Sequence, residues 1–191
     1  MRFSVLFNNA NRLWLFFGLY FLTKYRPVHV KRTGVIPILS LERICIVLGA
    51  GLVFFPKLHV WFLATPFHSS YPTALTGFVM VVLGLAFSAW ARDVLGRNWS
   101  GRVIIQNGHQ LITSGPYAYV RHPLYTGILV GIAGMALIAG DVGSLIGFAF
   151  ALTFTLLKAE REERILEVEF GPTYAIYREH TGALLPRIAH V

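Results

Sequence analysis

The feature that most constrains this chain is a series of long apolar runs separated by short polar intervals. The cleanest run, Thr73 to Ala91, contains nineteen residues without a charge. Only 14% of the 191 residues are charged, whereas roughly 25% is usual in soluble domains. A helix needs about 20 apolar residues to cross a bilayer. We therefore expect an all-α, polytopic integral membrane protein.

Five apolar segments predict transmembrane helices. The first, 5–23, is interrupted by three asparagines and Arg12, so it either crosses the bilayer with Arg12 at the interface or lies along its surface. Crossing is the favoured interpretation. The other four segments are 44–63, 73–91, 124–140 and 142–157.

The last two segments are predicted to form a tight helical hairpin. Only Gly140, Asp141 and a following glycine separate them, which leaves no room for a soluble linker. Gly127 with Gly131, and Gly143 with Gly147, have the spacing that lets helices approach closely in lipid.

The distribution of basic residues predicts the orientation. Fourteen of the seventeen Lys and Arg residues fall in three alternate connections, 24–43, 92–121 and 158–191. Cytoplasmic connections carry such an excess. We therefore expect the polar stretch 106–127 and the C-terminal tail to share the cytoplasmic face and to form a pocket there.

Other classes of site are disfavoured. The net charge of +8 forms no basic block, so no nucleic-acid partner is expected. The single Cys45 excludes an intrachain disulfide. None of the seven histidines is paired at the close helical spacing of diiron enzymes, so we predict no metal site. We expect no removable signal peptide and find no sign of an obligate protein partner.

Motifs in the polar stretch and the tail resemble those of a known family. Residues 109–117 read His-Gln-Leu-Ile-Thr-Ser-Gly-Pro-Tyr, and residues 121–127 read Arg-His-Pro-Leu-Tyr-Thr-Gly. Glu162-Glu163 and, at 170–174, Phe-Gly-Pro-Thr-Tyr follow the predicted hairpin. Together these motifs, within about 98–186, resemble the isoprenylcysteine carboxyl methyltransferase family. Arg-His-Pro-x-Tyr alone is shared with phospholipid methyltransferases and echoed in membrane sterol reductases.

The resemblance implies an S-adenosylmethionine (SAM) cofactor held between the loop before the hairpin and the helix after it. The family also places an arginine on the substrate side, one turn before its cofactor-binding glutamate. Lys158 occupies that position here; it keeps the charge but not the flat bidentate fork that suits a carboxylate. The implied cofactor contacts are Gln106, His109, Gln110, Leu111, Ile112, Tyr117, His122, Pro123, Leu124, Tyr125 and Glu162.

The chemistry of these residues agrees with that cofactor. A methyl donor with a flat adenine, ribose hydroxyls and a sulfonium needs apolar walls, aromatic faces and an acceptor carboxylate. No Gly-x-Gly-x-x-Gly motif offers a Rossmann site instead. A carboxylate or thiolate acceptor needs no general base, whereas an ammonium must first lose a proton. The candidate catalytic residues are therefore Lys158 for the acceptor and Glu163 or His122 as a base.

We expect an integral membrane SAM-dependent methyltransferase whose lipophilic acceptor enters from the bilayer. The favoured acceptor is an isoprenylcysteine-like carboxylate, and a phospholipid or another lipophilic amine or thiol is the alternative. An NADPH-dependent membrane reductase and a non-enzymatic binding or scaffold protein are the other classes considered. The chain is expected to be one domain, 1–191, with N-terminal spans in 1–97 and the catalytic region in 98–186.

Overall fold

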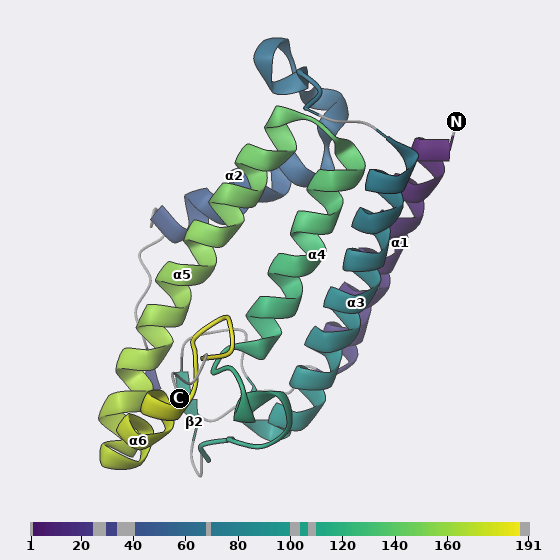
Figure 1. Ribbon diagram of the computed structural model, residues 1–191. Coiled ribbons are helices and arrows are strands. Elements are labelled where there is room, and N and C mark those ends of the chain that lie inside the picture. Colours follow the sequence, from purple (N-terminus) through teal and green to yellow (C-terminus); the bar gives the residue numbers. More distant parts are fainter. Residues whose placement is uncertain are drawn as a thin grey trace.

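The computed structural model describes residues 2–24, 30–33, 41–67, 70–99, 104–106 and 110–187. Long helices run side by side through this part of the chain, and short helices and loops lie at their ends (Figure 1). The α-helices are α1 (Arg2–Thr23), α2 (Leu41–Phe54), α3 (Tyr71–Leu95), α4 (Pro123–Ala139), α5 (Val142–Phe170) and α6 (Pro172–His180). The 3-10 helices are η1 (Pro56–Leu58), η2 (Trp61–Ala64), η3 (Gly96–Asn98) and η4 (Gly115–Ala118), and the strands are β1 (Val30–Thr33) and β2 (Ile104–Gln106).

Two stretches of the described chain are long and apolar enough to cross a bilayer. They are 71–98, which contains α3, and α5. Shorter apolar helices cover Ile44–Phe54 and Pro123–Ala139. The apolar part of α5 ends at Leu157, and the next thirteen residues of the same helix contain all of its charged side chains. With about 43 Å for 29 residues, α5 extends beyond a hydrocarbon core of about 30 Å.

The predicted hairpin between α4 and α5 is confirmed. Gly140 ends α4 in the left-handed conformation, with a φ of 69°, which a glycine adopts without steric cost. Asp141 then caps α5, because its side chain accepts a hydrogen bond from the backbone N–H of Ser144 at 2.8 Å. From this turn the two helices diverge, so that their far ends stand apart (Figure 1).

Each arm of the hairpin packs against a different helix through glycines. On α3, a Cβ atom added to Gly84 would lie 2.5 Å from the carbonyl oxygen of Gly127 on α4. On α5, a Cβ atom added to Gly147 would lie 2.8 Å from the side chain of Val53 on α2. The small-residue spacing therefore does mark close approaches, but these join α4 to α3 and α5 to α2 rather than the two arms to each other.

The end of the molecule at the α4–α5 turn is fastened by polar contacts. The buried His59 ring places Nδ1 3.1 Å from Oδ1 of Asp141, and a Cβ atom added to Gly143 would collide with that ring. The backbone N–H of Val142 donates to the carbonyl of Thr65 at 3.0 Å. The connection between α2 and α3 is thereby tied to the hairpin turn.

Two expectations from the sequence need correction. The second apolar segment, predicted as one helix from 44 to 63, is α-helical only to Phe54 and continues as the short 3-10 helices η1 and η2, because Pro56 lacks the N–H that the next α-helical turn requires. The chain is also not entirely helical: β1 and β2 pair as a short antiparallel ladder. The helical fold is otherwise confirmed in the described residues.

The close approach of α3 and α4 leads to a stability prediction. Gly84→Ala should lower the free energy of unfolding by about 1–3 kcal/mol, because the added methyl group meets backbone rather than a movable side chain. Gly18→Ala is the matched control, since nothing lies within 4 Å of its added Cβ atom. Thermal unfolding in detergent measures both variants. Equal midpoints for the two variants would contradict the packing described.

Candidate cofactor and acceptor site

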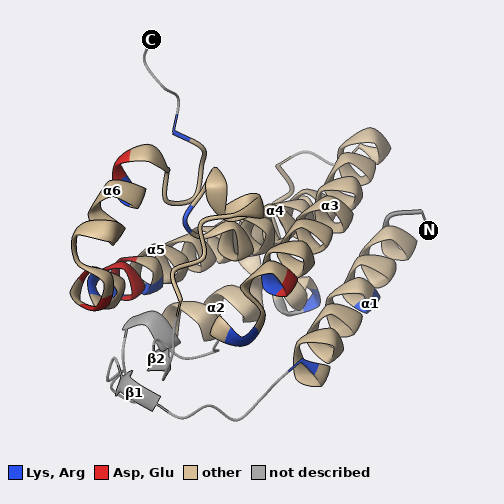
Figure 2. Ribbon diagram, turned by 90° about the horizontal axis from the view of Figure 1, so that it is seen from below, with Lys and Arg blue, Asp and Glu red and all other residues tan. Residues whose placement is uncertain are grey.

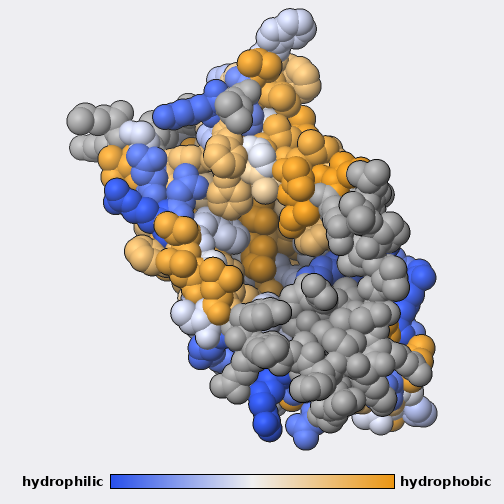
Figure 3. All heavy atoms as spheres, turned by 180° about the vertical axis from the view of Figure 1, so that it is seen from behind, coloured by the Kyte–Doolittle hydropathy of each residue, from blue (hydrophilic) through white to orange (hydrophobic). Residues whose placement is uncertain are grey.

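A cavity of about 320 Å³ lies between the diverging arms of the hairpin. Charged residues gather at the end of the molecule that lies away from the α4–α5 turn. They lie on the last turns of α5, on α6 and at the ends of α1 and α3 (Figure 2). The back of the molecule is hollowed, and the walls of the hollow are mainly apolar (Figure 3). The cavity therefore has an apolar arm among the helices and a polar end beside the charged turns of α5.

A hydrogen bond across the hairpin marks the polar end of the cavity. The hydroxyl of Tyr125, in the first turn of α4, donates to Oε1 of Glu162 on α5 at 2.5 Å. The His122 ring stacks on Tyr125, with centroids 5.5 Å apart and planes at 8°, and its Nδ1 lies 3.7 Å from Oε2 of Glu162. Pro123 starts α4, a position that suits proline, and so places these two rings on one side of the helix.

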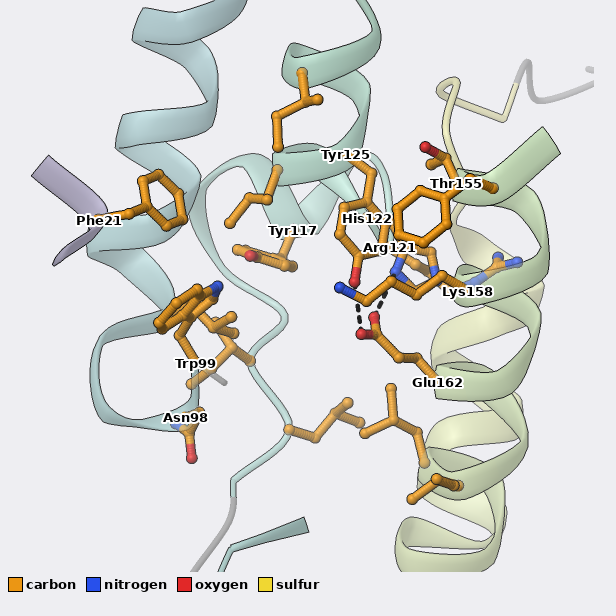
Figure 4. A pocket seen from close by; sticks show the side chains of 18 of the residues that line it. Phe21, Asn98, Trp99, Tyr117, Arg121, His122, Tyr125, Thr155, Lys158 and Glu162 are labelled. Atoms are coloured by element: carbon orange, nitrogen blue, oxygen red, sulfur yellow. Dashed lines mark hydrogen bonds and ion pairs between the residues drawn. The ribbon is translucent and has the colours of Figure 1, made fainter. Parts of the chain in front are cut away.

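Lys158 lies one turn before Glu162 on the same face of α5. Its Nζ is 5.1 Å from the centroid of the Tyr125 ring, within range of a cation–π contact. Lys158 lines the cavity, and it forms no ion pair among the described residues. Figure 4 shows Tyr125 and His122 of the α4 side meeting Lys158 and Glu162 of α5.

Glu163 holds a different set of partners behind this cluster. Its Oε1 accepts from Nε of Arg121 at 2.9 Å and lies 3.1 Å from Nε2 of His122. Its Oε2 accepts from the second guanidinium nitrogen of Arg121 at 3.3 Å. Burial would raise the pKa of Glu163, but hydrogen bonds from His122 and Arg121, together with their charges, lower it to about 2. Glu163 is thus a carboxylate with both oxygens occupied.

Apolar and aromatic side chains form the remaining walls. Leu111 and Ile112 come from the loop before η4, and Tyr117 comes from η4 itself. The Tyr117 backbone is held by the hydroxyl of Tyr177, which donates to the Tyr117 carbonyl at 2.7 Å. Burial, followed by the negative charge of Glu162, raises the pKa of Tyr117, so its hydroxyl stays neutral.

The structure brings together most of the residues that the sequence singled out. The predicted residues that line the cavity are Gln110, Leu111, Ile112, Tyr117, His122, Leu124, Tyr125, Lys158 and Glu162. Pro123 is buried at the start of α4 without lining the cavity, and Glu163 lies behind it. His109 and the side chain of Gln106 lie outside the part of the chain that the structure describes.

Sequence reasoning missed the contribution of the N-terminal half. Phe21 of α1 and Trp99, after η3, line the cavity opposite Tyr125 and Glu162 (Figure 4). Their rings meet edge to face, with centroids 5.3 Å apart. On α4 and α5, Ile128, Ile132 and Phe154 line the apolar arm. None of these residues belongs to a local motif; only their aromatic or apolar character hinted at a wall.

Among the described residues, the cavity lining therefore offers the Glu162 carboxylate, the Lys158 ammonium, the Arg121 guanidinium that Glu163 holds, and several aromatic faces around an apolar space. Within the described residues, no group of three or more His, Cys, Asp or Glu side chains is placed to hold a metal ion. Such a set of side chains suits a ligand that combines hydroxyl groups with flat and apolar parts.

Comparisons with known proteins agree with this picture. The isoprenylcysteine carboxyl methyltransferase (ICMT) family profile matches residues 76–168. A protein-S-isoprenylcysteine O-methyltransferase of Schizosaccharomyces pombe is 32% identical over 66% of this chain and 54% of its own length. The protein-S-isoprenylcysteine O-methyltransferase B of Arabidopsis thaliana is 30% identical over 72% of this chain and 66% of its own length.

A bacterial relative has a different name. The cobalt-zinc-cadmium resistance protein CzcN of Cupriavidus metallidurans is 32% identical over 64% of this chain and 56% of its own length. The chain thus spans about half the length of the relatives from Schizosaccharomyces pombe and Cupriavidus metallidurans.

A solved structure shares the fold. The eukaryotic intramembrane Ras methyltransferase ICMT superposes with a TM-score of 0.56 and 26% identity, over 81% of this chain and 55% of that one. The family match, the relatives and the shared fold agree with the long apolar helices, and the chain is an integral membrane protein. It belongs to the isoprenylcysteine carboxyl methyltransferase family.

Proposed function

We propose that this chain is an integral membrane methyltransferase that uses SAM and methylates a lipophilic acceptor, an isoprenylcysteine-like carboxylate. The observation that carries the proposal is the contact between Tyr125 and Glu162 across the hairpin, at the polar end of an otherwise apolar cavity. It joins the two motifs that characterise the family, and it leaves Lys158 beside them for the acceptor.

The residues present fit SAM. Glu162 is a carboxylate that can accept from ribose hydroxyls, since only one of its oxygens is taken by Tyr125. Leu111, Ile112 and Tyr117 offer a slot for a flat ring. His122, Leu124 and Gln110 complete the proposed cofactor contacts. Gln106, His109 and Pro123 stay predictions from the family motif alone.

Bound SAM supplies an electrophilic methyl group on a sulfonium, which is a good leaving group. The protein then has to align the acceptor and exclude water. Lys158 is placed to hold an anionic head group near Tyr125, where it forms no ion pair with any described residue. Phe21, Trp99 and Tyr117 close the opposite side with aromatic rings.

The geometry favours an acceptor that is already a nucleophile at neutral pH. An ammonium would have to lose a proton to a base first. Of the two candidate bases, Glu163 has both oxygens occupied by Arg121 and His122, and the His122 ring lies between the two glutamates. We therefore propose that Glu163 positions its neighbours and that His122 orients the cofactor region, while a phospholipid amine remains the alternative acceptor.

The apolar arm is proposed to take the hydrocarbon part of the acceptor from the bilayer. Ile128 and Ile132 line it from one helix and Phe154 from the other, so its wall offers no polar anchor at these positions. An acceptor that enters between the helices keeps its chain in this arm and its head group near Lys158.

The proposed topology has five crossings, with the cavity and the tail on the cytoplasmic side. It is supported by the bias of Lys and Arg towards three alternate connections, and by the charged end of the molecule beside the cavity (Figure 2). We further propose that residues 1–191 act as one domain, in which 98–186 carry most of the site and the N-terminal spans supply one wall.

A direct test uses the purified protein in nanodiscs with methyl-labelled SAM and total membrane lipid. Mass spectrometry should find the label in a lipophilic product, as a methyl ester if the acceptor is a carboxylate. Label in an amine or thiol would support the alternative acceptor. Binding of NADPH without binding of SAM would instead identify a reductase and contradict the proposal.

Removing the Glu162 charge should weaken the binding of SAM. Glu162→Gln exchanges a charge-assisted hydrogen bond for a neutral one, so the dissociation constant of SAM should rise about 10- to 100-fold. Glu160→Gln is the matched control, because this exposed glutamate on the same helix pairs only with Arg164 among the described residues. Isothermal calorimetry in detergent measures both variants, and equal affinities would remove Glu162 from the cofactor site.

Removing the Lys158 charge should act on the acceptor instead. Lys158→Met keeps the apolar stem of the side chain but removes its charge. The KM for an anionic acceptor should therefore rise about tenfold, the effect of losing one charge pair between enzyme and acceptor. The dissociation constant of SAM should stay close to that of the wild type. Initial rates over a series of acceptor concentrations provide the measurement. A change in SAM affinity with an unchanged KM would place Lys158 on the cofactor side.

A further inference from the structure

A short C-terminal segment, residues 181–184, lies beside the loop that begins α4, and we call it the strap. Four successive strap carbonyls accept hydrogen bonds from that loop. The acceptors are those of Thr181 from the Arg121 guanidinium, Gly182 from the Arg121 backbone at 2.8 Å, Ala183 from the His122 backbone at 3.0 Å and Leu184 from the Thr126 hydroxyl at 2.6 Å.

The strap is folded by a glycine and fixed by α6. A Cβ atom at Gly182 would collide with the carbonyl oxygen of Leu185, so the turn of the strap requires glycine. Thr181 is buried, and its hydroxyl donates to the carbonyl of Tyr177 at the end of α6 at 2.6 Å. Arg121 donates in addition to the carbonyl of Arg178 at 3.2 Å.

These contacts define the position of the loop that carries the site. Both the backbone N–H and the guanidinium of Arg121 are bonded to the strap, and the guanidinium also holds Glu163. The backbone N–H of His122 points to the strap while its ring points to Glu163 and Glu162. Helix starts leave such N–H groups without partners inside the helix, and the strap satisfies them here. No strap residue lines the cavity.

We infer that the strap positions the His122–Tyr125 side of the cavity, so that Thr126 and Gly182 are positioning residues for the cofactor. This inference rests on the proposed function, since it concerns the same site. It assigns a role in cofactor binding to a segment that does not itself line the cavity.

The test compares full-length variants in nanodiscs by two measurements. Amide hydrogen exchange of peptides that cover 120–126 reports the strap contact without any ligand, and calorimetry with SAM reports the site. Thr126→Val removes the hydroxyl donor and Gly182→Ala displaces the strap. Thr126→Ser keeps the hydroxyl, and Leu185→Ala trims a side chain that is 74% exposed.

Thr126→Val and Gly182→Ala should both speed exchange in 120–126 and raise the dissociation constant of SAM about tenfold, the effect of losing hydrogen bonds between the strap and the loop. Thr126→Ser and Leu185→Ala should match the wild type, and the acceptor KM should not change in any of the four. Unchanged exchange in Gly182→Ala and Thr126→Val, or faster exchange with unchanged SAM affinity, would overturn the inference. If the wild type does not bind SAM, the proposed function fails, and the exchange data still decide whether the strap orders the loop.

Discussion

Glu162 and Glu163 are neighbours in the chain, yet they hold two different structures together, because successive side chains leave a helix about 100° apart. Glu162 turns into the cavity and meets Tyr125. Glu163 turns away from it and binds Arg121 and His122. The first contact joins the arms of the hairpin at the cavity, and the second fixes the loop from which one arm begins. The geometry of the site depends on both contacts at once.

The cavity exists because the hairpin is narrow at one end and wide at the other. Gly140 and Asp141 force the two helices together at the turn, and close packing pulls each arm away from its partner farther along. Because Gly84 has no side chain, α4 packs directly against α3 there. Gly147 in the same way lets α5 pack directly against α2. Since each arm is held by an outer helix, the space between them does not collapse. The aromatic side chains of Phe21 and Trp99 then close one side of it.

Local patterns in the sequence predicted the elements well, and long-range contacts poorly. The hairpin and the third span followed from apolar runs and glycine spacing, and most of the site residues that the family motifs predicted do line the cavity. The end of α2 at Phe54 was missed because the apolar run continues past Pro56, and hydropathy does not register the missing backbone donor. The β1–β2 pair, the buried His59–Asp141 contact and the wall formed by Phe21 were missed because no local signal encodes which distant segments meet.

The strap adds a different constraint to the evolution of such a chain. Its contributions are backbone carbonyls, and every amino acid supplies the same carbonyl. Substitutions at Ala183 or Leu184 therefore leave the accepting atoms in place, whereas an insertion or deletion would shift the whole row of carbonyls by one residue. Two strap positions are restricted at the side chain: Gly182 has no room for a Cβ atom, and the buried Thr181 hydroxyl donates to the Tyr177 carbonyl. Selection should thus act on the length of this segment as well as on Thr181 and Gly182, and it should act least on the residue types at positions 183 and 184.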